Sequence, residues 1–314
     1  MSSELAIGVD IGGTKIAFVL VDDSGVVIQN DKISVAAYPD SDALLDAIAE
    51  GIQRLIAAVP IIGIGIGVPG HVNPDSGVVR NAVNMGWREM HLVDEIRRRL
   101  NNDIPLFLAK DANAAALGEK YFGVARDCDD FIYIAIGTGL GGSAVSGGKL
   151  ITGGNNFAME IGHLALVPDG RLCACGLRGC PEMYVSGIGF MAGWQAYRHD
   201  YPDSTLAVME NATTVDILDA ARAGDSLGRR IIDEAVEWLS LVAACNAALF
   251  NPDLIVIGGG LGIAAADLLL EPLFEATRHR VINMTHEKLK FVLSGVRESA
   301  VGAASLVWHQ KRRR

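Results

Sequence analysis

The sequence predicts an α/β protein built from two related halves. Strand-like and helix-like segments alternate along the whole chain, which is typical of this fold class. The stretch "IGVDIGGTKIAFV" near the N-terminus can also be laid on "IAIGTGLGGSAVS" farther along, so that Gly12 falls on Gly139. Each stretch has two apolar runs joined by a turn of glycine and threonine. This repeat predicts two α/β domains that face each other across a cleft.

The composition fits such an architecture and excludes several classes of partner. The chain has 314 residues, of which 50% are hydrophobic and 20% charged, so two domains can each bury a core. Its net charge of -10 argues against nucleic-acid and membrane surfaces as partners, because both attract clustered positive charge. We find no signal-peptide pattern and no run of 18 apolar residues, and we expect a cytoplasmic protein.

The elements of the first half follow from apolar periodicity and turn residues. The clearest helix begins at Ser41, a good N-cap, and carries an apolar stripe that includes Leu44, Ile48 and Ile52. In order, we expect strands over 5–13, 14–22 and 25–33, a helix over 41–59, a strand over 61–70, a helix over 92–100, a strand over 105–111 and a helix over 112–123.

The second half repeats the opening pattern and then continues with helices and strands. Its first segment, 130–154, reads as strand, turn, strand, turn and strand. The rest is predicted as a long helix over 227–250, strands over 252–260 and 289–294, and a final helix from about Val296. Following the repeat, we expect one lobe over 1–115 and another over 116–295.

The two glycine turns predict phosphate binding. "GTGLGG" fits the dinucleotide fingerprint formally, but that motif needs a helix directly after the glycines, and Ser143–Val145 predict a strand. Glycines still let backbone N–H groups converge on an anion, so the two turns can hold the β- and γ-phosphates of a nucleotide from both sides. The alternative is a pair of ordinary tight hairpins. The residues concerned are Asp10, Gly12, Gly13, Thr14 and Lys15, with Gly137, Thr138 and Gly139.

Two further features extend the nucleotide hypothesis. Asp10 ends the first strand and can attract Mg²⁺, through water, because this ion gives up its hydration reluctantly. Gly259 and Gly260 end another buried strand, where bare backbone can lie against an adenosine. Together with the turns, these residues predict a site for ATP and Mg²⁺.

The segment "CACGLRGCPE" contains three of the five cysteines and predicts a metal site. Cys173 and Cys175 are too close for a relaxed disulfide, and a reducing cytosol disfavours one. Zn²⁺ binds thiolates and imidazole in a tetrahedron, and His163 and Cys180 complete such a set. Because protein ligands fill all four positions, we expect a structural zinc ion. The alternative is three buried cysteines and an unrelated histidine.

These pieces resemble the ROK family of repressors, open reading frames and sugar kinases. The matching segments are "DIGGTK", "KDANAAALGE", "GTGLGG", "EIGH", "CACGLRGCPE" and "IGGG", in family order between residues 5 and 260. The resemblance implies two ribonuclease-H-like domains of the actin-like ATPase superfamily, with the final helix, 296–314, packed back on the first lobe. It also implies phosphorylation of a hexose by ATP with Mg²⁺, in a homodimer or homotetramer.

The resemblance gives individual residues their expected roles. Asp111 corresponds to the catalytic base that faces the sugar 6-hydroxyl; taken alone, it could equally be the N-cap of the following helix. Glu160, His163 and Glu182 correspond to residues that bind sugar hydroxyls near the anomeric end, so that His163 would serve both zinc and sugar. Asn84 corresponds to an Asn that contacts the sugar, and Gly70 lines the same side of the site as Asn84.

One departure from the family bears on the substrate. The family commonly has Asn directly before the catalytic Asp, whereas this chain has Lys110, which can only donate hydrogen bonds. We expect glucose as the substrate, and fructose, mannose, allose and N-acetylhexosamines stay open as alternatives. Polyphosphate stays open as an alternative phosphoryl donor. A catalytically silent sugar sensor is the alternative from another class. Few residues precede the first strand, so we expect no DNA-binding domain of the kind that the family's repressors carry.

Overall fold

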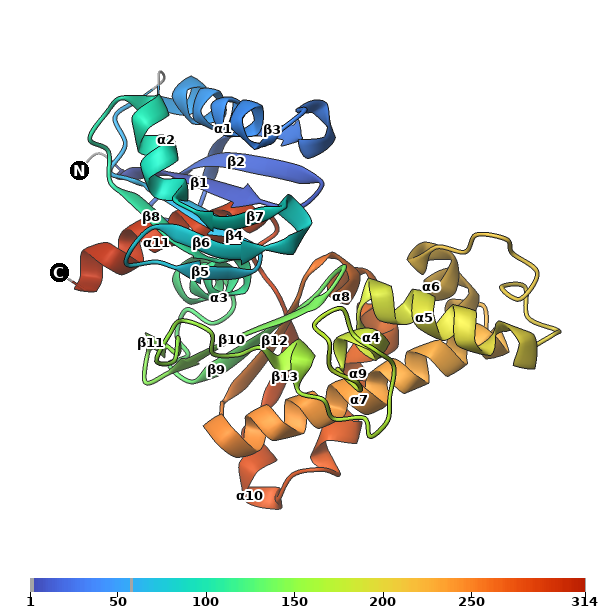
Figure 1. Cartoon of the computed structure of the whole chain (residues 1–314). Coiled ribbons are helices and arrows are strands. Elements are labelled where there is room, and N and C mark those ends of the chain that lie inside the picture. Colours follow the sequence, from blue (N-terminus) through green and yellow to red (C-terminus); the bar gives the residue numbers. More distant parts are fainter. Residues whose placement is uncertain (1–2, 57–58, 314) are drawn as a thin grey trace. The chain divides into compact units, whose positions relative to one another are not determined.

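The computed structural model describes residues 3–56 and 59–313. The chain divides into two compact units (Figure 1). The first runs to Asp127 and adds Leu150–Ala158 and the segment from Gly295 onward, and the second consists of Cys128–Lys149 and Met159–Ser294.

The first unit is built on a sheet that two helical layers cover. Its elements are β1 (Leu5–Ile11), β2 (Lys15–Asp22), β3 (Val27–Ser34), η1 (Val35–Ala37), α1 (Ser41–Ile56), β4 (Ile64–Val68), β5 (His71–Asn73), β6 (Val78–Ala82), η2 (Val83–Met85), β7 (Trp87–Met90), α2 (Leu92–Leu100), β8 (Leu106–Lys110), α3 (Asp111–Phe122) and α11 (Ser299–Arg313). Among the described residues, the larger sheet has the order β3-β2-β1-β4-β8, and β5, β6 and β7 form a second sheet.

Alternate residues of β1 serve the two faces of the larger sheet, as the pleat requires. Ile7 and Val9 are fully buried in a cluster with the apolar stripe of α1 and with α2. Ala6 points the other way and packs with residues of α11. Both layers therefore follow from the two-residue period of one strand.

Glycines in β1 and β4 let α11 lie directly on the sheet (Figure 1). A methyl group on Gly8 would come within 1.8 Å of the carbonyl oxygen of Ala300, and one on Gly65 within 1.9 Å of that of Ala303. No side chain larger than hydrogen fits between these backbones. The C-terminal helix thus depends on bare backbone in two strands that precede it by more than 200 residues.

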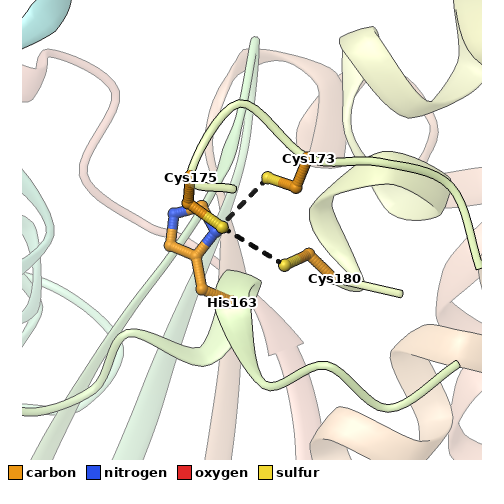
Figure 2. A group of neighbouring side chains, drawn as sticks. All are labelled: His163, Cys173, Cys175 and Cys180. Carbon is orange, nitrogen blue, oxygen red and sulfur yellow. Dashed lines mark hydrogen bonds between the residues drawn. The ribbon is translucent and has the colours of Figure 1, made fainter. Parts of the chain in front are cut away.

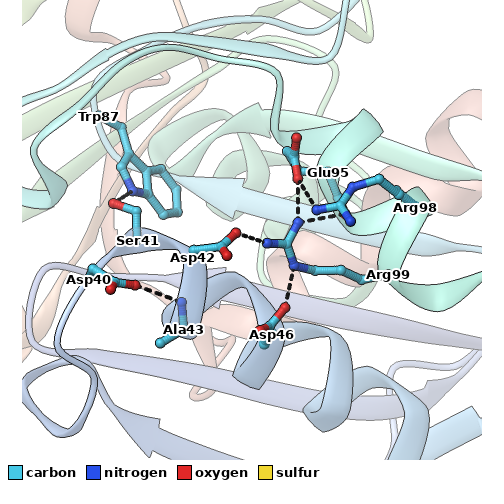
Figure 3. A network of polar contacts seen from close by, with 9 residues as sticks. All are labelled: Asp40, Ser41, Asp42, Ala43, Asp46, Trp87, Glu95, Arg98 and Arg99. Atoms are coloured by element: carbon cyan, nitrogen blue, oxygen red, sulfur yellow. Dashed lines mark hydrogen bonds and ion pairs between the residues drawn. The ribbon is translucent and has the colours of Figure 1, made fainter.

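An arginine network joins α1 to α2 on the opposite face (Figure 3). The side chain of Arg99 is 7% exposed and forms ion pairs with Asp42, Asp46 and Glu95; its Nε lies 2.7 Å from Asp46 Oδ1. At the start of α1, the indole of Trp87 donates to the hydroxyl of Ser41 over 3.0 Å. These contacts fix the two helices and the second sheet relative to each other within this unit.

The second unit repeats the strand order of the first. Its elements are β9 (Phe131–Ile136), β10 (Leu140–Ser146), β11 (Lys149–Leu150), η3 (Ile161–His163), α4 (Glu182–Val185), α5 (Gly187–Tyr197), η4 (Arg198–Asp200), α6 (Thr214–Arg222), α7 (Ser226–Phe250), β12 (Leu254–Gly258), α8 (Gly260–Ala264), α9 (Ala266–Arg278), α10 (Asn283–His286) and β13 (Lys290–Leu293). The described strands form one sheet in the order β11-β10-β9-β12-β13.

The shared strand order confirms the predicted α/β class and duplication. In each sheet the first two strands of the repeat pair antiparallel, and the later strands add in parallel on the other side. The helix predicted over 41–59 is α1, which ends at Ile56; residues 57 and 58 lie outside the described residues, as do residues 1, 2 and 314 of the expected first lobe.

The structure corrects two expected boundaries. The division between residues 115 and 116 falls inside α3, which continues without a break to Phe122, and the first unit extends to Asp127. The last helix begins at Ser299, not at Val296. In the described ranges, none of the helices combines the length and apolar character needed to cross a bilayer.

Candidate active site and metal centre

Three predicted residues of the first unit lie at one edge of its larger sheet. Strands β1, β4 and β8 run parallel, with Asp10 opposite Gly67 and Val68 opposite Lys110. The carboxyl ends of parallel strands meet at the same edge, where α/β proteins commonly bind ligands. Asp10 near the end of β1, Gly70 just after β4 and Asp111 directly after β8 therefore share that edge.

Asp111 is exposed and opens helix α3. Its Oδ1 accepts a hydrogen bond of 2.7 Å from the backbone N–H of Ala112. The N-terminus of a helix favours negative charge, and a carboxylate in this position can accept a hydrogen bond from a bound hydroxyl. Lys110, the last residue of β8, is 8% exposed beside it.

The first glycine turn contacts the predicted sugar-binding asparagine. The turn is closed by a hydrogen bond of 3.0 Å from Gly12 N–H to the carbonyl of Lys15, and Thr14 lies within it. A methyl group on Gly13 would lie 3.1 Å from Cβ of Asn84, which belongs to η2. The structure thus brings a predicted phosphate turn and a predicted sugar contact together.

Asp10 has a partner that the sequence did not indicate. The hydroxyl of Ser299, at the start of α11, donates to Asp10 Oδ2 across 289 residues of chain. Burial raises the pKa of Asp10, while the Ser299 hydrogen bond and the charge of Lys15 act to lower it. Nothing local in the sequence could have found this pair, since it depends on how α11 packs on β1.

The second glycine turn occupies the corresponding edge of the second unit. Gly137, Thr138 and Gly139 link β9 to β10, so a strand follows the glycines and the dinucleotide fingerprint is excluded here, as predicted. Gly259 follows the neighbouring parallel strand β12 at φ 80°, and a methyl group there would lie 2.3 Å from the carbonyl oxygen of Ile136. Gly259 and Gly260 therefore lie beside the turn.

His163, Cys173, Cys175 and Cys180 converge on one point (Figure 2). Their ligand atoms all lie within 4.8 Å of one another. Cys173 Sγ is 3.7 Å from His163 Nδ1, and the sulfurs of Cys175 and Cys180 are 3.6 Å apart. Ligands on a tetrahedral Zn²⁺ with Zn–S bonds of about 2.3 Å lie roughly 3.8 Å from each other. The donor set and its spacing thus fit Zn²⁺.

The thiols differ in acidity. Burial raises the pKa of Cys173, and burial together with a hydrogen bond that the Cys180 thiol donates to Cys175 raises the pKa of Cys180 to about 12. Burial also acts to raise the pKa of Cys175, but hydrogen bonds from the Leu177 N–H and the neighbouring thiols outweigh it and lower the value. A metal ion must therefore displace protons to bind here.

Glu182 connects the cysteine cluster to the glycine turn. Its Oε2 accepts a hydrogen bond of 2.9 Å from Leu140 N–H, directly after the turn, and its Oε1 lies 3.9 Å from Cys173 Sγ. A methyl group on Gly139 would touch the same carboxylate at 2.5 Å. Glu182, a predicted sugar contact, thus touches both the predicted phosphate turn and the Cys/His cluster.

Glu160 is held close to this group by the backbone. It precedes η3, and its carbonyl accepts a 3.0 Å hydrogen bond from the N–H of His163. Gly162 packs on β10, where a methyl group would come within 2.3 Å of the Leu140 carbonyl oxygen. The second unit therefore holds Glu160, His163 and Glu182 near the start of β10.

Comparisons with known proteins identify the family to which the chain belongs. The chain is 34% identical over 312 residues to the glucokinase of Streptomyces coelicolor, covering 96% of this chain and 97% of the relative. It is 30% identical to a xylose repressor of Caldicellulosiruptor bescii, covering 94% of this chain and 75% of that longer protein.

A solved structure is similar throughout. The ROK family glucokinase from Streptomyces griseus, determined with glucose and AMPPNP, is 33% identical with a TM-score of 0.82, and the match covers 97% of this chain and 99% of that one. The sequence model of the ROK family itself matches residues 6–310. The chain therefore belongs to the ROK family.

Proposed function

We propose that this protein is an ATP-dependent sugar kinase that phosphorylates a hexose at its 6-hydroxyl, with glucose as the first candidate. The observation that carries the proposal is Asp111, an exposed carboxylate at the carboxyl edge of the sheet. The full-length similarity to glucokinases supports the same activity.

In this proposal Asp111 orients the sugar hydroxyl and accepts its proton as the bond to phosphorus forms. Phosphoryl transfer demands little of the nucleophile, so positioning is the larger part of its contribution. Glu160, His163 and Glu182 accept or donate hydrogen bonds at hydroxyls near the anomeric carbon. Asn84 and Gly70 complete the sugar contacts.

The nucleotide is held by backbone groups in both glycine turns. We assign the phosphates to the turns at Gly12–Lys15 and Gly137–Gly139, and the adenosine to Gly259 and Gly260. Asp10 would hold Mg²⁺, and this ion would neutralise charge on the transferred phosphoryl group. The hydrogen bond from Ser299 fixes the carboxylate of Asp10 for that task.

The zinc ion has a structural part in the proposal. His163, Cys173, Cys175 and Cys180 would hold it, and this ligation would fix the imidazole ring of His163 for its contact with the sugar. We further propose a cytoplasmic homodimer or homotetramer, which light scattering of the purified protein tests.

A sugar sensor is the second candidate, favoured by the similarity to a xylose repressor. A sensor binds hexose without needing a base, whereas this chain keeps a carboxylate at position 111 beside an intact phosphate turn. Asp111 therefore favours the kinase.

The deciding experiment is an ADP-release assay with ATP and Mg²⁺ across glucose, fructose, mannose, allose and N-acetylhexosamines, on protein analysed for zinc. We expect turnover on glucose, and polyphosphate in place of ATP tests the donor. Silence on every sugar, in protein that binds hexose by calorimetry, would instead identify a sensor.

A further inference from the structure

A buried ion pair outside the predicted site joins the segment just before Cys173 to helix α7. Arg171 lies two residues before Cys173, and its Nη2 donates over 2.8 Å to Glu234 Oε2 on α7. The Glu234 side chain is 6% exposed and that of Arg171 is 17% exposed. Neither residue of the pair belongs to the proposed metal ligands, so another role must account for the position of the pair.

Arg171 holds the chain on both sides of the site. Its Nη1 donates over 2.8 Å to the carbonyl of Met183, the residue after Glu182. Its backbone N–H donates over 2.7 Å to the hydroxyl of Tyr184, and its guanidinium lies 4.4 Å from the centre of that ring. One side chain thus ties the start of the cysteine loop to α4, which carries Glu182.

Glu234 in turn anchors Arg171 to the long helix. Its other oxygen accepts a hydrogen bond from the hydroxyl of Tyr197, at the end of α5. The Arg171 guanidinium lies 5.5 Å from the Tyr197 ring centre, and Arg230 adds a second positive charge 3.8 Å from Glu234 Oε1. The planar guanidinium serves two acceptors at once, which a lysine ammonium does less well.

We infer that Arg171 and Glu234 form a positioning device that sets Glu182 against the metal cluster. The inference rests on the proposed sugar kinase function for its substrate readout. The chain of contacts runs from α7 through Glu234 and Arg171 to Met183 and so to Glu182, whose carboxylate reaches Leu140 and Cys173. Neither residue of the pair is among the proposed sugar contacts; both act through Glu182 and the loop.

The test compares variants of the pair with matched controls. Glu234→Leu removes the anchor, and we expect hexose affinity about tenfold to a hundredfold weaker, with faster loss of zinc to a chelator and little change in kcat. Glu234→Gln keeps a hydrogen-bond acceptor for Arg171 and should therefore retain most of the hexose affinity and most of the resistance to zinc loss. The control is Arg222→Lys, which alters a remote ion pair with Asp267 in the same unit.

A double variant separates positioning from stability. Breaking one side of a buried pair destabilises a protein, whereas replacing both partners with apolar residues often does not. Arg171→Met with Glu234→Leu should therefore regain the melting temperature while hexose affinity stays weak. Recovery of hexose affinity together with stability would overturn the inference, because the pair would then serve the fold alone.

The two readouts distinguish this inference from the proposed function. If the wild-type protein binds no hexose by calorimetry, the sugar kinase proposal fails and the link to Glu182 falls with it. In that case the rate of zinc loss still tests whether the pair holds the cysteine loop in place. If the wild type binds hexose and the double variant binds it equally well, the positioning role fails while the kinase stands.

Discussion

Two aspartates at one sheet edge have surroundings that suit different tasks. Asp111 is exposed at the start of a helix, where it can accept a proton from a substrate. Asp10 is held by a hydrogen bond from the hydroxyl of Ser299, which suits the proposed role of holding an ion, while burial raises its pKa. Environment therefore separates a proposed base from a proposed metal anchor.

Asp111→Asn should reduce kcat by about 10²–10⁴-fold and leave hexose binding nearly intact, because the amide can orient the hydroxyl but cannot take its proton. Steady-state kinetics and calorimetry measure the two effects. Asp103→Asn, at an exposed aspartate of the same unit, is the control. Near-normal turnover in Asp111→Asn would remove this residue from the role of base.

Cys175→Ser should lose stoichiometric zinc and weaken hexose binding by about tenfold to a hundredfold, since the proposed zinc ion would orient His163. Metal analysis and calorimetry provide the measurements, with Cys245→Ser as a control outside the cluster. Loss of zinc without any change in hexose affinity would contradict the coupling through His163.

Zinc affinity should also rise with pH. The raised pKa values of Cys173 and Cys180 keep both thiols protonated at neutral pH in the metal-free protein, and binding must displace those protons. The affinity should therefore increase by roughly tenfold per pH unit for each proton displaced. Competition with a chelator at several pH values measures this slope; a flat profile would mean that the thiols are already ionised.

At the scale of elements, one capping residue secures the longest helix of the second unit. Asp225 Oδ1 accepts hydrogen bonds from the N–H groups of Leu227 and Gly228, and the carboxylate also binds Ser204 and Thr205. Since α7 carries Glu234, the cap supports the anchor of the metal loop as well as the helix.

Asp225→Ala should lower the free energy of unfolding by about 0.5–2 kcal/mol through loss of the cap. Burial acts to raise the pKa of Asp225, but the hydrogen bonds from Ser204, Gly228 and Thr205 outweigh it and lower the value. The stabilisation is therefore present above the unfolded-state pKa of about 3.9 and disappears as pH falls toward the folded-state value.

Denaturant titrations of the wild type and of Asp225→Asn measure that pH dependence. The amide keeps an acceptor for the helix but has no proton to gain in this range, so its stability should fall less steeply below about pH 4. Equal slopes in the two proteins would show that other carboxylates set the acid response.

The contact of α11 with the sheet should tolerate no added side chain. Gly65→Ala would place a methyl group 1.9 Å from the Ala303 carbonyl oxygen, and we expect a loss of about 1–3 kcal/mol or more in stability. Gly154→Ala, where the added group meets nothing within 4 Å, should change stability by less than about 0.5 kcal/mol. Thermal unfolding compares them, and similar melting temperatures would argue against close helix packing.

At the scale of the whole molecule, the features that the sequence predicts are those that depend on patterns within short stretches of chain. The duplicated strand order follows from two strand–turn–strand stretches, and the metal cluster follows from cysteines within eight positions of one another. The sheet of β5, β6 and β7 was not predicted, because strands such as "HVN" and "WREM" are short and mixed in polarity.

Short-range sequence patterns could not predict the contacts between segments that are distant in the chain. Ser299 meets Asp10 across 289 residues, and Arg171 meets Glu234 across 63. Each pair depends on the packing of a helix against another element, which no local periodicity specifies. The domain boundary also differs from the expected one for this reason, since α3 packs against α11 and stays whole in the first unit.

The discontinuity of the first unit has a consequence for synthesis on the ribosome. Helix α11 emerges after every residue of the second unit, so the face of β1 and β2 that includes Ala6, Val19 and Val21 lacks its cover while the intervening chain is being made. Nascent domains with uncovered apolar strands are the ones that bind chaperones or aggregate. A truncation before Ser299 should therefore yield a chain whose second unit is complete in sequence but whose first unit is a client of the cell's holdases.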